Sequence, residues 1–313
     1  MPETTLCNWL VMNSAIAACA LLLDRLFGEF LQRSHPVVLI GRFISAFERR
    51  LYADSFRHGV LLWLATLAVA LTGAFLTLWL VQMLPGWLAF LLTTVLASTL
   101  LAHRMLYDSV NAVLYSPQPQ ESVAMLVSRD TQSMSHADAY KAAIETYAEN
   151  LSDGVIAPLF FLLLFGLPGI VFYKTVNTLD SMVGYRTQRY EKFGKFSARI
   201  DDLANWIPAR ISAILIMLLN RQWRFWSFYT NGNQHKSPNA GHPITAMALS
   251  CRCRLGGPTA YFGQLQEKAY FGRRHDTRSV TSAHLQCALK RRNAIDLTLI
   301  AGCIALGIIC HHV

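Results

Sequence analysis

Long hydrophobic runs separated by charged segments restrict this chain to the folds of membrane proteins. The longest run covers residues 60–84, and a second run at 87–102 follows the uncharged pair Pro85-Gly86. A helix that crosses a bilayer needs about 20 consecutive apolar residues, and the first run exceeds that length. We therefore predict a transmembrane helical hairpin that turns at Pro85-Gly86.

The composition supports the same class of protein. Of the 313 residues, 53% are hydrophobic and 15% are charged, and the mean hydropathy is +0.31. The formal net charge of +9 could indicate a nucleic-acid-binding protein, but the chain has no compact basic tract and no zinc-finger spacing. Cytoplasmic loops of membrane proteins normally carry an excess of Lys and Arg. The lipid bilayer is therefore the predicted partner, and no nucleic acid is expected.

Four further apolar runs complete a predicted all-α, polytopic integral membrane protein with about 4–6 membrane segments. They cover residues 11–23, 155–173, 206–219 and 294–310. The run 155–173 contains Gly-Leu-Pro-Gly at 166–169, where we predict a break into two half-helices that re-enter the membrane. Broken helices are tolerated where they pack in protein or line a polar cavity. Two complete crossings, by this run and by 206–219, are the alternative.

The charges of the loops predict the orientation. The loop 24–59 is rich in Arg, whereas the Pro85-Gly86 turn is uncharged, so the positive-inside rule places the loop in the cytoplasm and the turn outside. The strongly basic region 221–293 should then be cytoplasmic as well. If the broken run re-enters, the polar blocks on both sides of it face the cytoplasm, and Arg186 is accessible from that side.

These two polar blocks form a motif core, 140–210, within a single predicted membrane domain, 1–313. In the first block Glu145, Glu149 and Asp153 are spaced i, i+4, i+8, which places three carboxylates on one helix face. Like charges at this spacing repel unless a cation lies between them, and Mg²⁺ takes carboxylate oxygens together with waters and substrate phosphates. We predict a candidate Mg²⁺ site; a solvated acidic face is the alternative.

The second block begins where the broken run ends. Lys174, Asn177 and Ser181 share one helical face, and Asp180 lies at its edge. Lys174 could simply extend to the membrane interface. Asn177 and Asp180 have no such explanation within an otherwise apolar turn, so they are predicted site residues.

The end of the core carries further charges. Arg199 and Asp202 are spaced i, i+3 and could form an ion pair. Arg210 lies in the next apolar run, where an unpaired Arg is costly, so its partner should be Asp202, Asp201 or a bound phosphate. Asn205 is expected to cap the helix that begins at residue 206.

The common nucleotide-binding and hydrolytic motifs are missing from the sequence. There is no GxxxxGK[ST] loop, no GxGxxG turn after a strand, and neither HExxH nor GxSxG occurs. Phosphate binding would therefore depend on Lys and Arg side chains, backbone amides and a metal ion.

Several long motifs resemble one family. The segments 145–161, 173–186 and 189–211 (ETYAENLSDGVIAPLFF, YKTVNTLDSMVGYR and RYEKFGKFSARIDDLANWIPARI) are similar to those of adenosylcobinamide-phosphate synthases, the CbiB/CobD type of cobalamin biosynthesis protein. Arg-Asp-Thr at 129–131, Ser-Pro-Asn-Ala-Gly at 237–241 and Leu-Gly-Gly-Pro at 255–258 support this resemblance.

The resemblance implies an ATP-dependent amide ligase of the bacterial inner membrane, multi-pass and with its site facing the cytoplasm. The enzyme would join the carboxylate of adenosylcobyric acid, a corrinoid, to the amine of aminopropanol phosphate or a related amino-alcohol phosphate, giving adenosylcobinamide phosphate. ATP and Mg²⁺ would be required. A second copy of the chain, or other membrane enzymes of cobalamin assembly, would be its protein partners.

The resemblance also implies roles for individual residues. The expected catalytic residues, of which the first three are the candidate Mg²⁺ ligands, are Glu145, Glu149, Asp153, Lys174, Asp180 and Asp202. The expected substrate- or nucleotide-binding residues are Asn150, Asn177, Ser181, Arg199, Arg210, Ser237 and Asn239.

The chain departs from the family pattern at two places. The usual Gly-Asp-Pro reads Gly28-Glu29-Phe30, and the Pro-Glu pair after 237–241 reads Pro243-Ile244, so one carboxylate is missing. Two other functions therefore remain open. One is a non-catalytic sensor or signalling relative. The other is a transporter, since broken helices are common in transporters.

Overall fold

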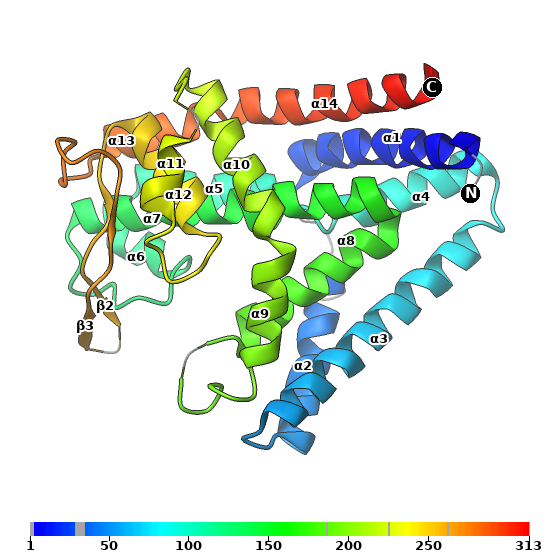
Figure 1. The fold of residues 1–313 in the computed structure, drawn as a ribbon, viewed down its shortest axis with the longest axis horizontal. Coiled ribbons are helices and arrows are strands. Elements are labelled where there is room, and N and C mark those ends of the chain that lie inside the picture. Colours follow the sequence, from blue (N-terminus) through cyan, green and yellow to red (C-terminus); the bar gives the residue numbers. More distant parts are fainter. Residues whose placement is uncertain (1–2, 29–34, 186, 225, 262, 313) are drawn as a thin grey trace. The chain divides into compact units, whose positions relative to one another are not determined.

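The computed structural model describes residues 3–28, 35–185, 187–224, 226–261 and 263–312 (Figure 1). Arg186, Glu29 and Phe30, on which parts of the sequence analysis depend, lie outside these residues. The chain divides into two compact units. Unit 1 comprises Met1–Ala102, Ala157–Ala204 and Thr298–Val313, and unit 2 comprises His103–Ile156 and Asn205–Leu297.

Helices dominate both units. Unit 1 holds α1 (Glu3–Phe27), α2 (Pro36–Leu51), α3 (Phe56–Val81), α4 (Gly86–Ser98), α8 (Ala157–Val183), α9 (Lys195–Ala204) and most of α14 (Arg292–His312). Unit 2 holds α5 (His103–Tyr115), α6 (Pro119–Ala124), α7 (His136–Leu151), the π-helical turn η2 (Ser152–Ile156), α10 (Trp206–Leu219), α11 (Ser227–Gly232), α12 (Gly241–Cys251) and α13 (Ser282–Leu289).

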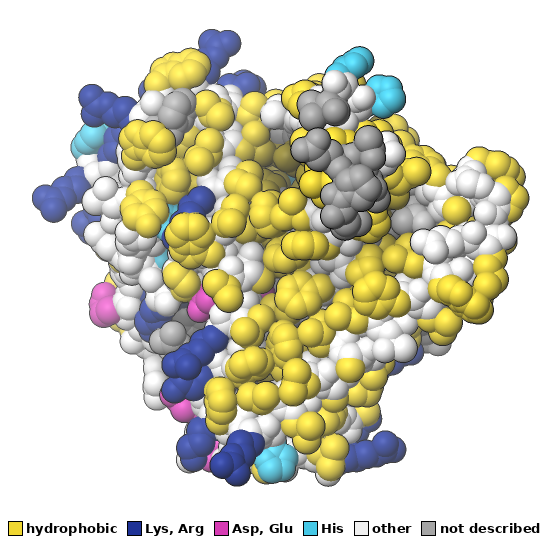
Figure 2. All heavy atoms as spheres, turned by 45° about the vertical axis from the view of Figure 1, so that its right-hand side comes forward, with side chains coloured by type: hydrophobic (Ala, Val, Ile, Leu, Met, Phe, Trp, Pro, Cys, Tyr) yellow, Lys and Arg dark blue, Asp and Glu magenta, His cyan; other side chains and the backbone are white. Residues whose placement is uncertain are grey.

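Five helical stretches in the described residues are long and apolar enough to cross a membrane: Leu6–Phe27, Phe56–Val81, Gly86–Tyr115, His136–Val183 and Ser282–His312. A sixth is reached if α9 and α10 count as one span. Many hydrophobic side chains are exposed on the face that Figure 2 shows. Such exposure suits helices that face lipid. The predicted all-α, multi-pass membrane protein is confirmed.

The predicted helical hairpin is present as α3 and α4. Ser55 caps α3, since its hydroxyl oxygen accepts a hydrogen bond from the His58 backbone N–H. Pro85 precedes the first residue of α4, where the fixed backbone of proline suits a helix start. The turn between the two helices is therefore where the sequence places it.

The predicted break in α8 occurs at Gly166. Its backbone angles, φ +64° and ψ −153°, lie in a region that is essentially restricted to glycine. The helix before the break ends with carbonyls that lack intrahelical donors, and α1 supplies two. Trp9 Nε1 donates to the Leu164 carbonyl at 3.3 Å, and Asn13 Nδ2 donates to the Leu163 carbonyl at 3.2 Å.

The chain folds back on itself at this break. The rings of Phe161 and Tyr173 stack with centroids 5.3 Å apart, and those of Phe161 and Phe172 are 5.7 Å apart. A straight helix would separate Phe161 from Tyr173 by about 18 Å. The two halves of α8 therefore lie side by side, as the half-helix prediction requires.

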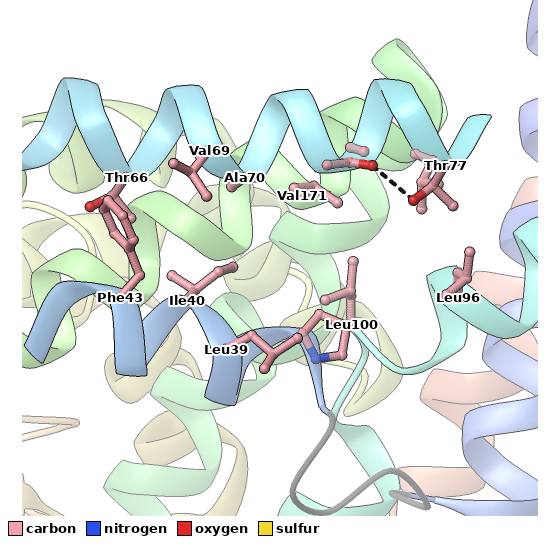
Figure 3. A pocket seen from close by; sticks show the side chains of 14 residues that line it. Leu39, Ile40, Phe43, Thr66, Val69, Ala70, Thr77, Leu96, Leu100 and Val171 are labelled. Atoms are coloured by element: carbon pink, nitrogen blue, oxygen red, sulfur yellow. Dashed lines mark hydrogen bonds between the residues drawn. The ribbon is translucent and has the colours of Figure 1, made fainter. Parts of the chain in front are cut away.

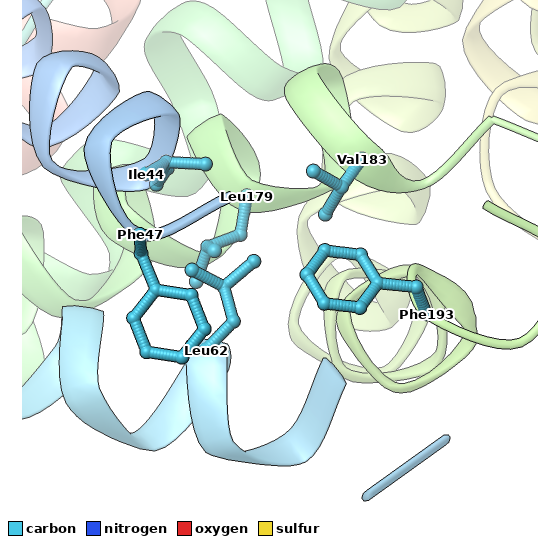
Figure 4. Packing of buried hydrophobic residues seen from close by; sticks show 6 residues of the cluster. All are labelled: Ile44, Phe47, Leu62, Leu179, Val183 and Phe193. Atoms are coloured by element: carbon cyan, nitrogen blue, oxygen red, sulfur yellow. The ribbon is translucent and has the colours of Figure 1, made fainter. Parts of the chain in front are cut away.

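Unit 1 contains a hydrophobic cluster formed by α2, the start of α3, the end of α8 and the segment before α9 (Figure 4). Its buried members are Ile44, Phe47, Leu62, Leu179, Val183 and Phe193. Gly59 allows this close packing, because a Cβ atom there would lie 1.8 Å from the Phe193 carbonyl oxygen. A second feature is an apolar hollow of about 320 Å³ between α2, α3, α4 and α8, lined by residues such as Ile40, Ala70 and Val171 (Figure 3).

Unit 2 packs its helices around α7 and α12 and adds four short strands, which the sequence analysis did not predict. β1 (Leu255–Gly256) pairs antiparallel with β4 (Tyr270–Phe271), and β2 (Thr259–Tyr261) pairs antiparallel with β3 (Gln264–Gln266). Helix α12 is buried along almost its whole length, including Ile244. The apolar residue that replaces the family's usual acid is thus packed in the core of this unit.

Candidate functional site

One cluster of predicted binding residues in unit 2 is formed by α10 and the loop that leads into α12. The Arg210 guanidinium reaches this loop from α10: its Nη1 donates to the Asn239 Oδ1 at 3.3 Å, and its Nη2 donates to the Pro238 carbonyl at 3.4 Å. Nη1 also donates to the Trp206 carbonyl at 2.7 Å. All three acceptors are uncharged, and the buried Nε has no hydrogen-bond partner among the described residues. The positive charge of Arg210 is therefore not neutralised by these contacts.

Aromatic side chains surround this cation. The Arg210 guanidinium carbon lies 4.3 Å from the ring centre of Trp206 and 5.8 Å from that of Tyr229, which are cation–π distances. Tyr229 in turn stacks on His242 with ring centres 5.0 Å apart. His242 is fully buried, and neither of its ring nitrogens makes a hydrogen bond to the described residues.

The loop itself is fixed by short-range hydrogen bonds. The Ser237 hydroxyl oxygen accepts from the backbone N–H groups of Asn239 (3.2 Å) and Ala240 (3.4 Å), and the Ser237 N–H donates to His235 Nδ1 (3.0 Å). A Cβ atom on Gly241 would lie 2.2 Å from the Gly232 carbonyl oxygen, so only glycine permits this approach. The structure thus brings together Arg210, Ser237 and Asn239, three of the residues predicted to bind substrate or nucleotide.

Burial keeps the two histidines of this cluster neutral. Desolvation, followed by the charge of Arg210, lowers the pKa of His242 to about 4. Desolvation also lowers the pKa of His235. At neutral pH the two histidines therefore add no charge to that of Arg210, which lies close to the N-terminal end of α12, where the helix dipole also favours an anion.

Glu145 on α7 has a different environment from the one predicted. The carboxylate is buried, 5% exposed, and accepts hydrogen bonds from the Arg129 guanidinium and from the Gly256 backbone N–H, the latter at 2.6 Å. The neighbouring Asp130 accepts from the Gly263 N–H at 2.6 Å. The motifs at 129–131, 145–161 and 255–258 therefore meet here. We call Glu145 a clamp because its carboxylate links α7 to Arg129 and to β1.

Glu149, Asn150 and Asp153 lie on the last turn of α7 and on η2. Glu149 and Asp153 are half-buried and Asn150 is exposed. No group of three or more His, Cys, Asp or Glu in the described part of the chain is placed to hold a metal ion. One reason is that Glu145 faces Arg129 and Gly256, and another is that the wider π-helical turn changes the rotation per residue before Asp153. The magnesium role of these carboxylates stays a prediction.

The other predicted residues belong to unit 1. Lys174, Asn177, Asp180 and Ser181 lie on the second half of α8, and Arg199 and Asp202 lie on α9. Asn177 Nδ2 donates to the buried Asp201 Oδ1 at 3.4 Å, which links the two helices. Asn205 occupies the N-cap of α10, but its side chain does not make the expected capping hydrogen bond.

A buried pair in unit 2 was not predicted. His103 Nδ1 lies 2.5 Å from Asp296 Oδ1, and both side chains are almost inaccessible. The hydroxyl of Tyr147 lies 3.4 Å from His103 Nε2. The isolated Asp296 in an otherwise apolar run was the available signal, because a buried carboxylate needs a partner; the identity of that partner, 193 residues away, could not be read from local spacing.

Comparison with known proteins places the chain in one family. The CobD/Cbib protein family matches residues 17–291. The cobalamin biosynthesis protein CobD of Photorhabdus laumondii is 38% identical over 279 residues, which cover 83% of this chain and 88% of the relative. The protein of the same name from Geobacter metallireducens is 40% identical over 280 residues, covering 82% and 86%. A probable cobalamin biosynthesis protein CobD of Pyrococcus furiosus is 39% identical over 250 residues, covering 77% and 85%.

No solved structure matches the chain. The length of the family match and the identities with relatives named as cobalamin biosynthesis proteins agree with the motif resemblance. The chain belongs to the CobD/CbiB family.

Proposed function

We propose that this protein is an ATP-dependent amide ligase of cobalamin biosynthesis. It would join the carboxylate of adenosylcobyric acid to the amine of aminopropanol phosphate, or of a related amino-alcohol phosphate, to give adenosylcobinamide phosphate. The proposed location is the bacterial inner membrane, with the site facing the cytoplasm. Membership of the CobD/CbiB family and the names of its relatives support a role in this pathway.

The observation that carries the proposal is the set of contacts made by the Arg210 side chain. Two of the three proposed reactants carry phosphate groups, and Arg binds phosphate through charge-assisted hydrogen bonds. The hydrogen bonds of Arg210 go to neutral acceptors, its buried Nε has no partner among the described residues, and two aromatic rings lie at cation–π distance. An anionic ligand would complete this arrangement.

The proposed chemistry follows from what an amide bond requires. A carboxylate oxygen attacks the γ-phosphorus of ATP, giving an acyl phosphate and ADP. The amine then displaces phosphate from the acyl carbon and loses one proton. Asp180 or Asp202, both expected catalytic residues, is proposed to accept that proton. Arg210 would bind and orient a phosphate group during these steps.

Magnesium, when bound, would neutralise phosphate charge. Glu149 and Asp153 are the carboxylates proposed to hold it, since Mg²⁺ usually needs only one or two carboxylates in addition to waters and phosphates. Ser152, between them, has a buried hydroxyl without a hydrogen-bond partner in the described residues. It lies on a π-helical turn, a feature that is frequent at functional sites.

The test is ligase activity of the purified full-length protein with adenosylcobyric acid, aminopropanol phosphate and Mg·ATP. Arg210→Gln should lower kcat/KM by about 100-fold, the usual cost of removing one group that stabilises developing charge. Arg224→Gln, which removes an exposed charge from the same region, should leave the rate unchanged. Equal rates for the two variants would refute the role of Arg210. Absence of corrinoid-dependent ADP release by the unmodified protein would refute the ligase itself.

A further inference from the structure

A cationic hollow in unit 2 is formed by other elements than those of the Arg210 cluster. It has a volume of about 570 Å³ and lies between α5, α13 and the first residues of α14. Lys290 and Arg292 line it, and none of its described lining residues is an Asp or Glu. The described lining residues therefore bring positive charge and no carboxylate to a space of the size that binds small molecules.

Arg292 is held in place rather than left free in solvent. Its side chain is 17% exposed, and its guanidinium carbon lies 4.2 Å from the ring centre of Tyr107 on α5. The Nε atom is buried and has no hydrogen-bond partner among the described residues. An Arg that merely flanks a membrane helix would direct its polar atoms to water, so this environment indicates a different role.

The neighbouring carboxylate of Asp296 forms only a long ion pair with Arg292. Asp296 Oδ2 is 3.9 Å from Arg292 Nε, too far for a hydrogen bond. The other carboxylate oxygen, Oδ1, lies 2.5 Å from His103 Nδ1. Asp296 is thus fixed by His103 and positions Arg292 electrostatically, while the N–H groups of Arg292 keep their capacity to bind a ligand.

The rest of the lining suits an oxygen-rich ligand. Asn111 on α5, Gln286 on α13 and Asn293 on α14 contribute three amide groups, each of which can donate and accept hydrogen bonds. The ring of Tyr115, largely exposed, borders the same space. Two cations and three amides form a set of groups that can recognise a phosphate group.

We propose that the hollow lined by Lys290 and Arg292 binds a phosphate-bearing small molecule at a site separate from the Arg210 cluster. The two cations would hold the phosphate, the amides would bind its oxygens, and Tyr107 and Asp296 would position Arg292. This site is defined by its own residues and does not depend on the ligase reaction.

The experiment measures binding to the full-length protein in nanodiscs of neutral phosphatidylcholine. The probes are inorganic phosphate, ethanolamine phosphate and a non-hydrolysable ATP analogue. Lys290→Gln removes one cation from the rim, and Gln286→Glu adds a negative charge to the lining. The matched controls, at exposed positions elsewhere in unit 2, are Arg274→Gln and Gln264→Glu. The same binding measurements are made on Arg210→Gln, and thermal unfolding checks that each variant is folded.

We expect Lys290→Gln and Gln286→Glu each to weaken binding of at least one probe by about tenfold, as loss of a charge-assisted contact does, whereas the two controls do not. The same probe should still bind to Arg210→Gln. Nanodiscs that contain phosphatidylglycerol distinguish a lipid headgroup from a free phosphate compound, because a headgroup would compete with the probe. The proposal is overturned if no probe binds, if the lining variants bind like their controls, or if Arg210→Gln alone abolishes binding.

Discussion

The clamp formed by Glu145 makes a prediction that separates a structural role from a metal-binding role. Glu145→Gln removes the negative charge but keeps the shape of the side chain. The amide can still accept from the Gly256 N–H, yet its NH₂ group then faces the N–H groups of Arg129, so two donors oppose each other. Because Arg129 is only 12% exposed, its charge is left buried without its carboxylate. Breaking one partner of a buried ion pair costs about 3–5 kcal/mol.

The double variant Arg129→Gln/Glu145→Gln removes both charges and leaves two amides that can bond to each other. We expect it to be about 2 kcal/mol more stable than the sum of the two single losses, since contacting residues couple by up to about 3 kcal/mol. The measurement is denaturant unfolding of the full-length protein, with hydrogen exchange of residues 255–263 as a local readout. Asp138→Asn breaks the half-exposed pair with Lys141 and should cost less than about 1 kcal/mol.

Two results would contradict the clamp. One is a Glu145→Gln variant that loses no more stability than Asp138→Asn. The other is strict additivity in the double variant, which would mean that Glu145 and Arg129 do not interact in solution. If the double variant is stable but has lost the affinity for Mg²⁺ that the unmodified protein shows, the metal role predicted from the sequence would be supported.

Three further predictions concern backbone, pH and packing. Gly166→Ala should destabilise the protein by about 2 kcal/mol, because alanine is strained at positive φ, whereas Gly302→Ala, where a Cβ atom meets nothing within 4 Å, should be neutral or stabilising in thermal melts. The pKa of His242 is about 4 in the folded protein and about 6.5 in the unfolded chain. The stability that the protein has with His242 neutral is therefore fully present above pH 6.5 and is lost as the pH falls through 4. The loss is roughly 3 kcal/mol, so His242→Phe should flatten the dependence of the unfolding midpoint on pH between 7.5 and 4.5, and an unchanged dependence would contradict the neutral state of His242. Gly73→Leu should raise the midpoint of thermal unfolding, because the free energy of unfolding should increase by about 1 kcal/mol. A Cβ atom at Gly73 also meets nothing within 4 Å, and Gly73 lines the apolar hollow, which the leucine side chain would enter. An unchanged or lower midpoint would contradict this packing.

Local patterns predicted the long apolar helices correctly. The hairpin of α3 and α4 and the bounds of α10 each depend on residues close together in the sequence. The fold-back at Gly166 was predictable for the same reason, because glycine and proline restrict the backbone where they stand. The donors from Trp9 and Asn13 that satisfy the broken end were not predictable.

Contacts between distant residues could not be derived from spacing. Glu145 was interpreted by its neighbours on the same helix face, whereas its partners are Arg129 on a preceding loop and Gly256, 111 residues away. For Arg210, the cost of a charge in an apolar run predicted Asp202, Asp201 or a bound phosphate as its partner. The hydrogen bonds of its guanidinium group go instead to Asn239 and to backbone carbonyls. The four strands were missed because each has only two or three residues, too few for an alternating pattern.

The way in which the two units share the chain affects how the protein can be made. The polypeptide leaves one unit for the other after Ala102, Ile156, Ala204 and Leu297, so neither unit is a continuous stretch. At about 5–20 residues per second, the ribosome needs on the order of 10–40 s after Ala102 to reach Thr298, the start of the last segment of unit 1. Throughout that time the first apolar helices lack part of their native packing, and the membrane or an insertion factor must shelter them. For the same reason, no single proteolytic cut between Ala102 and Leu297 releases one unit intact.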